Sequence, residues 1–103
     1  MPIRLQRYSL RRPGRLTPPP ARILRARSVQ LSPAGSMDWH STRNREELLI
    51  ALHGVMRLEV LPRGGLTLRA GESTFLPPRT RHRVVNRSRR IARYVYVTGG
   101  RAP

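Results

Sequence analysis

The residues of this chain that could bind a metal or take part in catalysis are three histidines and a small group of carboxylates. The histidines are His40, His53 and His82, and four of the five carboxylates fall between residues 31 and 60. Imidazole and carboxylate groups together bind Fe(II), Mn(II), Zn(II), Ni(II) or Co(II), and a site with three protein ligands leaves positions open for water or substrate. The chain contains no Cys, which excludes disulfides, thiolate nucleophiles and Cys-ligated zinc.

Two stretches of the chain place these residues at defined spacings. The first stretch is Gly35-x4-His40-x-Thr42-x4-Glu47-x6-Gly54. The second stretch is Gly71-x5-Pro77-x-Arg79-x2-His82-x3-Asn86. In this order, the two stretches resemble the two sequence motifs of the cupin superfamily, in particular its small single-domain proteins of the cupin 2 conserved-barrel type. The resemblance covers roughly residues 30–98.

The resemblance implies an all-β fold, the double-stranded β-helix or jelly-roll barrel. It also implies one divalent transition metal (Fe, Mn, Zn, Ni or Co), held by His40, Glu47 and His82. Two positions depart from the family pattern. Thr42 stands where the family usually has a second His, so one of the usual metal ligands is missing. Arg79 stands where the family usually has Gly, so the turn there can differ. A cupin barrel that has lost its metal is the alternative interpretation.

The carboxylate ligand has to be chosen between Glu46 and Glu47, because neighbours in a strand point to opposite faces. Glu47 precedes Gly54 by seven residues, as in the family's first motif, so we select Glu47 and expect Glu46 to pair with an Arg at the surface. His53 is six residues from Glu47, which is roughly 20 Å along an extended strand. We therefore expect His53 to lie at a strand end, away from the metal.

Short strands separated by turn residues must position these side chains. We expect strands at 23–31, 46–53, 55–60, 66–69, 73–76, 82–86 and 91–98, with a kink at Gly54. Such a pattern is typical of an antiparallel sandwich or barrel. Both faces of 46–53 are apolar, so we expect both to be buried, one in the barrel and one against the second sheet or a partner subunit.

The chain divides by composition into an Arg- and Pro-rich N-terminal arm, residues 1–22, and a single cupin barrel, residues 23–103. The arm contains Pro18-Pro19-Pro20, which cannot lie inside a helix or a central strand. We expect the arm to extend over the barrel surface, to cross to a partner subunit or to be partly disordered.

Four further side chains are candidates for lining the pocket around the metal: Trp39, Thr42, Tyr94 and Tyr96. Trp39 is next to His40 in the sequence and would either wall the site or pack elsewhere. Tyr94 and Tyr96 share one face of the last strand, where they line the pocket or belong to the core. The Thr42 hydroxyl is a poor metal ligand and would instead hydrogen-bond a bound water. No separate general base is evident, so the catalytic residues are unknown.

The charge of the chain is strongly positive, with 21 Arg, no Lys and a formal net charge of +16. Such a balance is typical of polyanion-binding proteins. The absence of Lys indicates a genome that favours Arg codons instead, so we do not expect nucleic acid to be the main partner. No apolar run is long enough to span a bilayer, and the N-terminus lacks the apolar stretch of a secretory signal. We expect a cytoplasmic protein and a homodimer.

Three functions are compatible with these features. The first is a metal-dependent binder of a small molecule or an enzyme of the oxygenase, isomerase or lyase type. The second is a non-catalytic, metal-free binding or sensor module for a small metabolite, for example an anionic one. The third is nucleic-acid binding through the Arg-rich residues 4–27, for which base-stacking aromatic residues are scarce. The cupin fold hosts many reactions, so the fold does not name the substrate.

Overall fold

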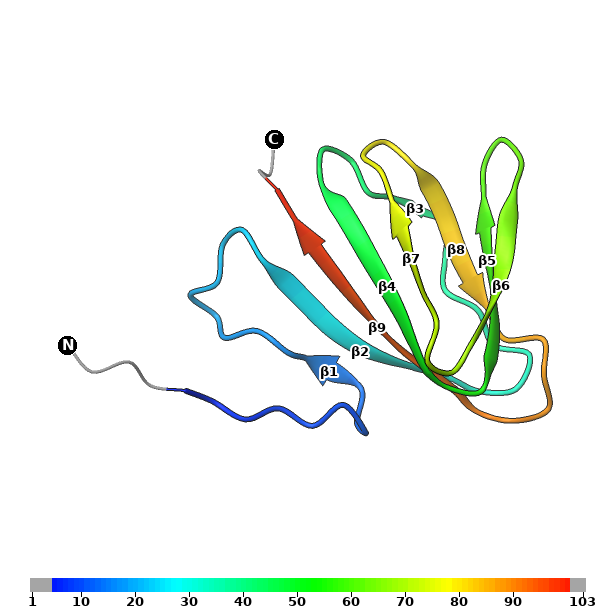
Figure 1. Cartoon of the computed structure of the whole chain (residues 1–103), viewed down its shortest axis with the longest axis horizontal. Coiled ribbons are helices and arrows are strands. Elements are labelled where there is room, and N and C mark those ends of the chain that lie inside the picture. Colours follow the sequence, from blue (N-terminus) through cyan, green and yellow to red (C-terminus); the bar gives the residue numbers. More distant parts are fainter. Residues whose placement is uncertain (1–4, 101–103) are drawn as a thin grey trace.

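The structure is a computed structural model that describes residues 5–100. In this part of the chain nine strands form two antiparallel sheets that face each other (Figure 1). The strands are β1 (Gly14–Arg15), β2 (Arg25–Leu31), β3 (His40–Ser41), β4 (Glu46–His53), β5 (Val55–Val60), β6 (Gly65–Arg69), β7 (Ser73–Leu76), β8 (Arg81–Val85) and β9 (Ala92–Gly99). The first sheet has the order β1-β2-β9-β4-β7 and the second the order β3-β8-β5-β6. The prediction of an all-β fold is confirmed, and two antiparallel sheets that face each other are consistent with the expected jelly roll.

The predicted strands agree with the observed ones to within two residues at each end, because Gly and Pro residues separate them. Gly54 shows why the kink predicted there is needed. It adopts a φ of +79° and carries the chain from β4 in the first sheet to β5 in the second. A Cβ at this position would come within 2.7 Å of the Ile91 carbonyl oxygen, so both the backbone angle and the close approach require Gly.

The hydrophobic core lies between the two sheets. Inward-facing residues of the first sheet meet inward-facing residues of the second, and alternation along each strand sends every second side chain to this core. The buried apolar residues of the core are Leu31, Leu49, Ala51, Met56, Leu58, Leu68, Leu76, Val84, Ala92 and Tyr94. Near Glu47 the barrel also buries the polar residues Thr42, Arg45 and His82, and we call this part its polar end. The apolar core reaches this part too, because Leu76 lies directly opposite Glu47.

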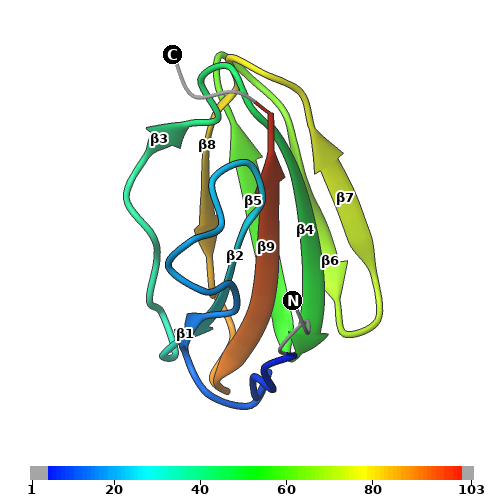
Figure 2. The same ribbon diagram turned by 90° about the vertical axis from the view of Figure 1, so that its left-hand side faces the viewer.

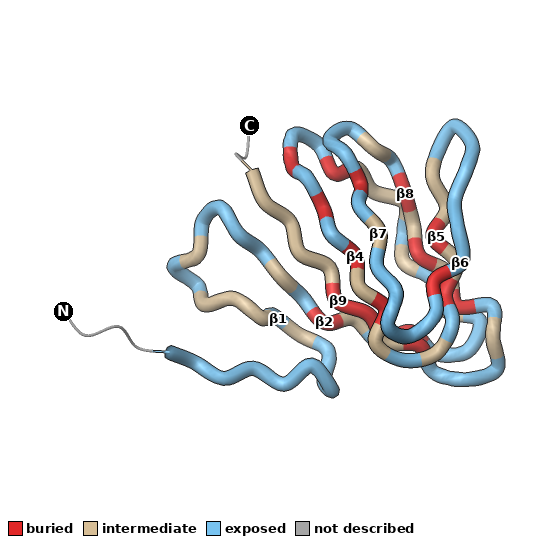
Figure 3. Tube along the Cα trace, in the orientation of Figure 1, coloured by how far each residue is buried: buried red, intermediate tan, exposed pale blue. Residues whose placement is uncertain are grey.

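The outer face of the first sheet is partly open (Figure 3). Leu48 of β4 lies directly opposite Phe75 of β7, and these two side chains are 41% and 54% exposed. In the single chain, the inner face of β4 is buried as expected, but its outer face is partly exposed. Whether a partner subunit covers the outer face stays a prediction.

Within the N-terminal arm, β1 pairs with β2 at the edge of the first sheet (Figure 2). In β1, Gly14 pairs with Ser28. The buried Ser28 hydroxyl also donates to the Leu10 carbonyl, and the Leu16 amide donates to the Ala26 carbonyl. The arm thus contributes a short edge strand, while residues 1–4 lie outside the described part of the chain. Between residues 5 and 100, no helix has the length and apolar character needed to cross a membrane.

Candidate metal centre

His40, Glu47 and His82 come together at the polar end of the barrel. His40 in β3 lies directly opposite His82 in β8, and their rings are 4.2 Å apart between centroids and tilted by 59°. Glu47 belongs to β4 in the facing sheet. One potential ligand atom from each residue lies within 4.8 Å of the other two, which is the spacing expected of groups that could surround one ion.

Backbone hydrogen bonds fix which nitrogen of each ring is free. His40 Nδ1 is 3.0 Å from the Asp38 carbonyl oxygen, and His82 Nδ1 is 3.0 Å from the Thr80 carbonyl oxygen. A carbonyl oxygen only accepts, so each Nδ1 carries a hydrogen and donates it. In the neutral ring the lone pair is then on Nε2, and this nitrogen is available to bind a metal while Nδ1–H stays bonded to the backbone.

The free nitrogen of His82 is buried without a hydrogen-bond partner. His82 is 1% exposed and Glu47 is 4% exposed. His82 Nε2 lies 3.3 Å from Glu47 Oε2, but it makes no hydrogen bond within residues 5–100. Burial alone would lower the pKa of His82, yet the Glu47 carboxylate and the Thr80 carbonyl outweigh burial, so the pKa of His82 is raised. An orphaned imidazole nitrogen next to a buried carboxylate fits a bound divalent cation.

The two positions that depart from the cupin pattern are both accommodated in the backbone. The buried Thr42 hydroxyl donates to the Pro77 carbonyl oxygen at 2.8 Å and accepts from the Thr80 amide at 3.0 Å. Thr42 thereby ties its loop to the turn that carries His82. Arg79 adopts a φ of +57°, so the turn uses the left-handed conformation although a side chain is present there.

The other predicted pocket residues occupy different places. Tyr96 lines the pocket next to Glu47. Tyr94 is 1% exposed, belongs to the core and donates its hydroxyl hydrogen to the Met37 sulfur. Trp39 has the Arg83 guanidinium 4.8 Å from its ring centroid and is not among the residues that line the pocket. His53 lies exposed at the end of β4, outside the cluster.

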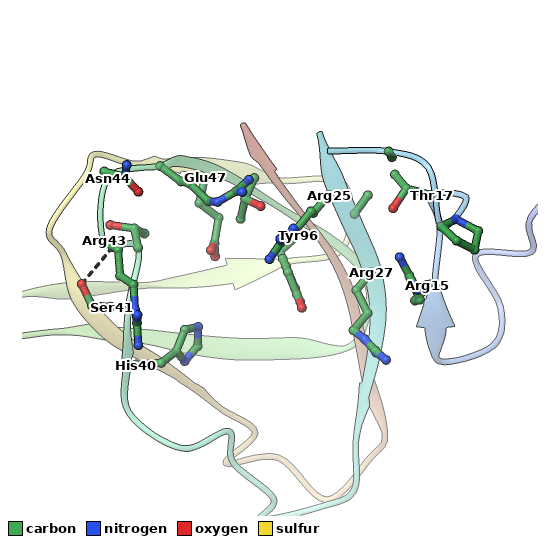
Figure 4. Close-up of a pocket in the computed structure, with 16 residues that line it drawn as sticks. Arg15, Thr17, Arg25, Arg27, His40, Ser41, Arg43, Asn44, Glu47 and Tyr96 are labelled. Carbon is green, nitrogen blue, oxygen red and sulfur yellow. Dashed lines mark hydrogen bonds between the residues drawn. The ribbon is translucent and has the colours of Figure 1, made fainter. Parts of the chain in front are cut away.

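A pocket of about 650 Å³ opens beside His40 and Glu47. Figure 4 shows His40 and Glu47 at one side, Arg15 and Arg27 at the other, and Arg25 and Tyr96 between them. The pocket is bounded by residues of the arm, β2, β9 and the loop after β3. They are Arg15, Thr17, Pro19, Ala21, Arg25, Ala26, Arg27, His40, Ser41, Thr42, Arg43, Asn44, Arg45, Glu47, Tyr96 and Thr98.

Sequence reasoning missed the arginines of this pocket. Arg25 and Arg27 lie on the same face of β2, opposite Thr98 and Tyr96 of β9. Alternation within the predicted strand 23–31 could have placed Arg25 and Arg27 on a common face. In a chain with 21 Arg, however, no residue-type signal distinguishes these two from the others.

Comparison with known proteins agrees with this geometry. Residues 27–98 match the Cupin domain family, Cupin_2. The chain belongs to the cupin family. The match spans β2 to β9 and so includes His40, Glu47 and His82. Among curated proteins, no sequence matches this cupin.

Several solved structures share the fold. A Cupin 2 conserved barrel domain protein from Salinispora arenicola CNS-205 superposes with a TM-score of 0.74 and 26% identity, over 97% of this cupin and 89% of that chain. An oxalate oxidase superposes with a TM-score of 0.69 and 19% identity, over 75% of this cupin and 42% of that chain. A predicted oxalate decarboxylase from Thermotoga maritima superposes with a TM-score of 0.67 and 17% identity, over 73% of this cupin and 64% of that chain. This cupin therefore spans less than half of the oxalate oxidase, and at these two lower identities the similarity shows a shared fold only.

Proposed function

We propose that this cupin binds one divalent transition metal through His40, Glu47 and His82 and a small molecule in the adjoining pocket. The observation that carries the proposal is the buried Nε2 of His82, which has a carboxylate beside it and no hydrogen-bond partner within residues 5–100. A protonated His82 would form an ion pair with Glu47 at this distance, and a cation shared by Glu47, His40 and the neutral His82 ring would take the place of that proton.

The surrounding residues support the same proposal. The Asp38 and Thr80 carbonyls hold both rings in the tautomer and orientation that a metal requires. Thr42 supports His82 indirectly, because its hydroxyl accepts from the amide of Thr80, the residue whose carbonyl accepts from the His82 ring. Three protein ligands leave coordination positions open toward the pocket.

A bound metal would supply Lewis-acid or redox chemistry at those open positions. The small molecule would enter through the pocket, which reaches His40 and Glu47, while His82 is buried at 1% exposure. The candidate reactions are those of an oxygenase, an isomerase or a lyase. Tyr96 is the nearest phenol among the pocket residues. Burial raises its pKa, Arg27 and Arg25 lower it and Glu47 raises it, with a net increase, so Tyr96 is a hydrogen-bond donor at neutral pH.

The second candidate function is a metal-free binding or sensor module. The observation that favours it is Thr42, which replaces a usual ligand of the family and commits its hydroxyl to the backbone of Pro77 and Thr80. In that case the pocket binds its ligand without a cation.

Metal analysis of the purified full chain separates the two candidates. The protein is dialysed against a chelator, reloaded in turn with Fe(II), Mn(II), Zn(II), Ni(II) and Co(II), and analysed by mass spectrometry for metal per chain. We expect close to one ion per chain for the wild type and loss of that ion in His82→Ala. His53→Ala is the matched control, because this histidine lies exposed at the end of β4, and it should keep the metal.

Two results would count against the proposal. Full metal occupancy in His82→Ala would exclude the His40–Glu47–His82 site. A wild type that takes up none of the five metals, while folded by circular dichroism, would favour the metal-free module.

A further inference from the structure

Within residues 5–100, Arg45 is a buried cation without a carboxylate partner. It is 8% exposed and lines the pocket wall. Its Nη1 donates to the Ile23 carbonyl oxygen at 2.9 Å, but its Nη2 is buried and has no hydrogen-bond partner within residues 5–100. Burying a guanidinium without a compensating anion is unfavourable, so the positive charge of Arg45 favours an anion in the adjoining pocket.

Two more arginines face the same space from β2. Arg25 and Arg27 pair across the sheet with Thr98 and Tyr96, and all four residues line the pocket. On the other side of β9, Thr98 and Tyr96 lie opposite Glu47 and Leu49 of β4. Residues directly opposite each other in a sheet point to the same face, so Arg25 and Arg27 lie on the face of the sheet that carries Glu47.

The charge balance of the pocket is strongly one-sided. Five arginines and one carboxylate line it, and that carboxylate is Glu47 of the candidate metal centre. In the described part of the chain, the only arginines that form ion pairs are Arg83 and Arg87, both with Glu59. The five pocket arginines therefore have no carboxylate partner within residues 5–100. Arg45 is buried, whereas Arg15, Arg25, Arg27 and Arg43 are exposed, and their combined positive charge should attract an anion to the pocket.

We propose that Arg45, Arg25 and Arg27 form a recognition site for a small organic anion that carries at least two negative charges, on a carboxylate pair or a phosphate group. The planar guanidinium fork matches the oxygens of both groups. This inference deepens the proposed function, since it names the ligand class of the pocket. One end of the anion binds the arginines, while the rest extends toward His40 and Glu47.

The proposal is tested on metal-free protein, so that its outcome is independent of metal binding. Calorimetric titrations use succinate and glycerol 2-phosphate, with butane-1,4-diol and glycerol as their uncharged counterparts. We expect the wild type to bind at least one of the two anions and neither butane-1,4-diol nor glycerol. Binding of succinate alone identifies a carboxylate ligand, and binding of glycerol 2-phosphate alone identifies a phosphate ligand.

Two sets of variants locate the site. Arg25→Gln combined with Arg27→Gln should weaken anion binding at least tenfold. Arg89→Gln combined with Arg90→Gln removes the same charge from exposed positions that do not line the pocket, and should keep the affinity within twofold. Arg45→Met should also lose binding, while its urea midpoint stays equal to or above that of the wild type, because the variant removes an uncompensated buried charge.

The proposal is overturned if neither anion binds to the folded wild type, or if both double variants lose affinity equally, which would mean that only the overall charge matters. A protein that takes up metal but binds neither anion would support the metal site and exclude the anion site. An apoprotein that binds the anion but takes up no metal would support the anion site and exclude the metal site.

Discussion

The side chain of Asn86 ties three segments of the barrel together, and its removal should be among the most damaging single changes. Asn86 is fully buried. Its Nδ2 donates to the carbonyl oxygens of Leu31 at 3.2 Å, Ser32 at 3.1 Å and Arg90 at 2.7 Å. Its Oδ1 accepts from the amide and the hydroxyl of Ser88. The side chain therefore joins the end of β2 to the loop between β8 and β9.

The cost of Asn86→Ala follows from how these partners are buried. The bond to Leu31 is buried, so leaving this carbonyl without its donor should cost about 1–3 kcal/mol. The bonds to Ser32 and Arg90 are partly exposed, so water can replace the lost donor there and each should cost about 0.5–1 kcal/mol. The sum is about 2–5 kcal/mol, a large fraction of the 5–15 kcal/mol that is typical for a domain.

Urea unfolding at pH 7 and 25 °C, followed by circular dichroism, measures this difference. Asn44→Ala is the control, because Asn44 is exposed, and it should change the free energy of unfolding by less than about 0.5 kcal/mol. Asn86→Asp offers a second readout, since its carboxylate would face three carbonyl oxygens. Its destabilisation should shrink as the pH falls and the carboxylate is protonated. The reasoning fails if Asn86→Ala and Asn44→Ala unfold at the same urea concentration.

Three further predictions concern other parts of the barrel. Gly65→Ala should destabilise the protein more than Gly71→Ala in urea unfolding. Both residues have positive φ, which should cost about 1–2 kcal/mol, but only at Gly65 would the new Cβ clash with backbone. Glu59→Gln should cost stability at neutral pH, because the hydrogen bond from Arg83 holds the pKa of Glu59 below its ordinary value of 4.5. The difference should be complete above pH 4.5 and should decrease as the pH falls from 4.5 through the lowered pKa of the folded state. Equal destabilisation at pH 3 and pH 7 would contradict this pairing. Phe75→Glu should convert a homodimer to monomer in light scattering if the outer face of the first sheet is the interface; an unchanged mass would place any interface elsewhere.

Much of the fold follows from the sequence because turn residues separate apolar strands of ordinary length. Gly54 and Gly71 mark changes of direction that the structure confirms with positive φ angles. The two-residue strands β1 and β3 were not predictable, since alternation needs four or more residues to be visible. That His40 lies in β3 had to come from the motif spacing instead.

The candidate site was predictable only where spacing carried information. Motif spacing selected the three residues that the structure brings within reach of one ion. The role of Thr42 was not predictable, because its partners Pro77 and Thr80 are more than thirty residues away in the chain. The burial of Arg45 was equally hidden, because it depends on how the arm and β2 close over the loop that follows β3.

The position of the candidate ligands on both sheets has a mechanical consequence. His40 and His82 belong to one sheet and Glu47 to the other. An ion coordinated by all three would act as a cross-link between the two layers, in addition to the hydrogen bond from Thr42 to the Pro77 carbonyl. Removing the ion should loosen this end of the barrel first, so amide hydrogen exchange should increase around β3 before it does so in the strands of the apolar core.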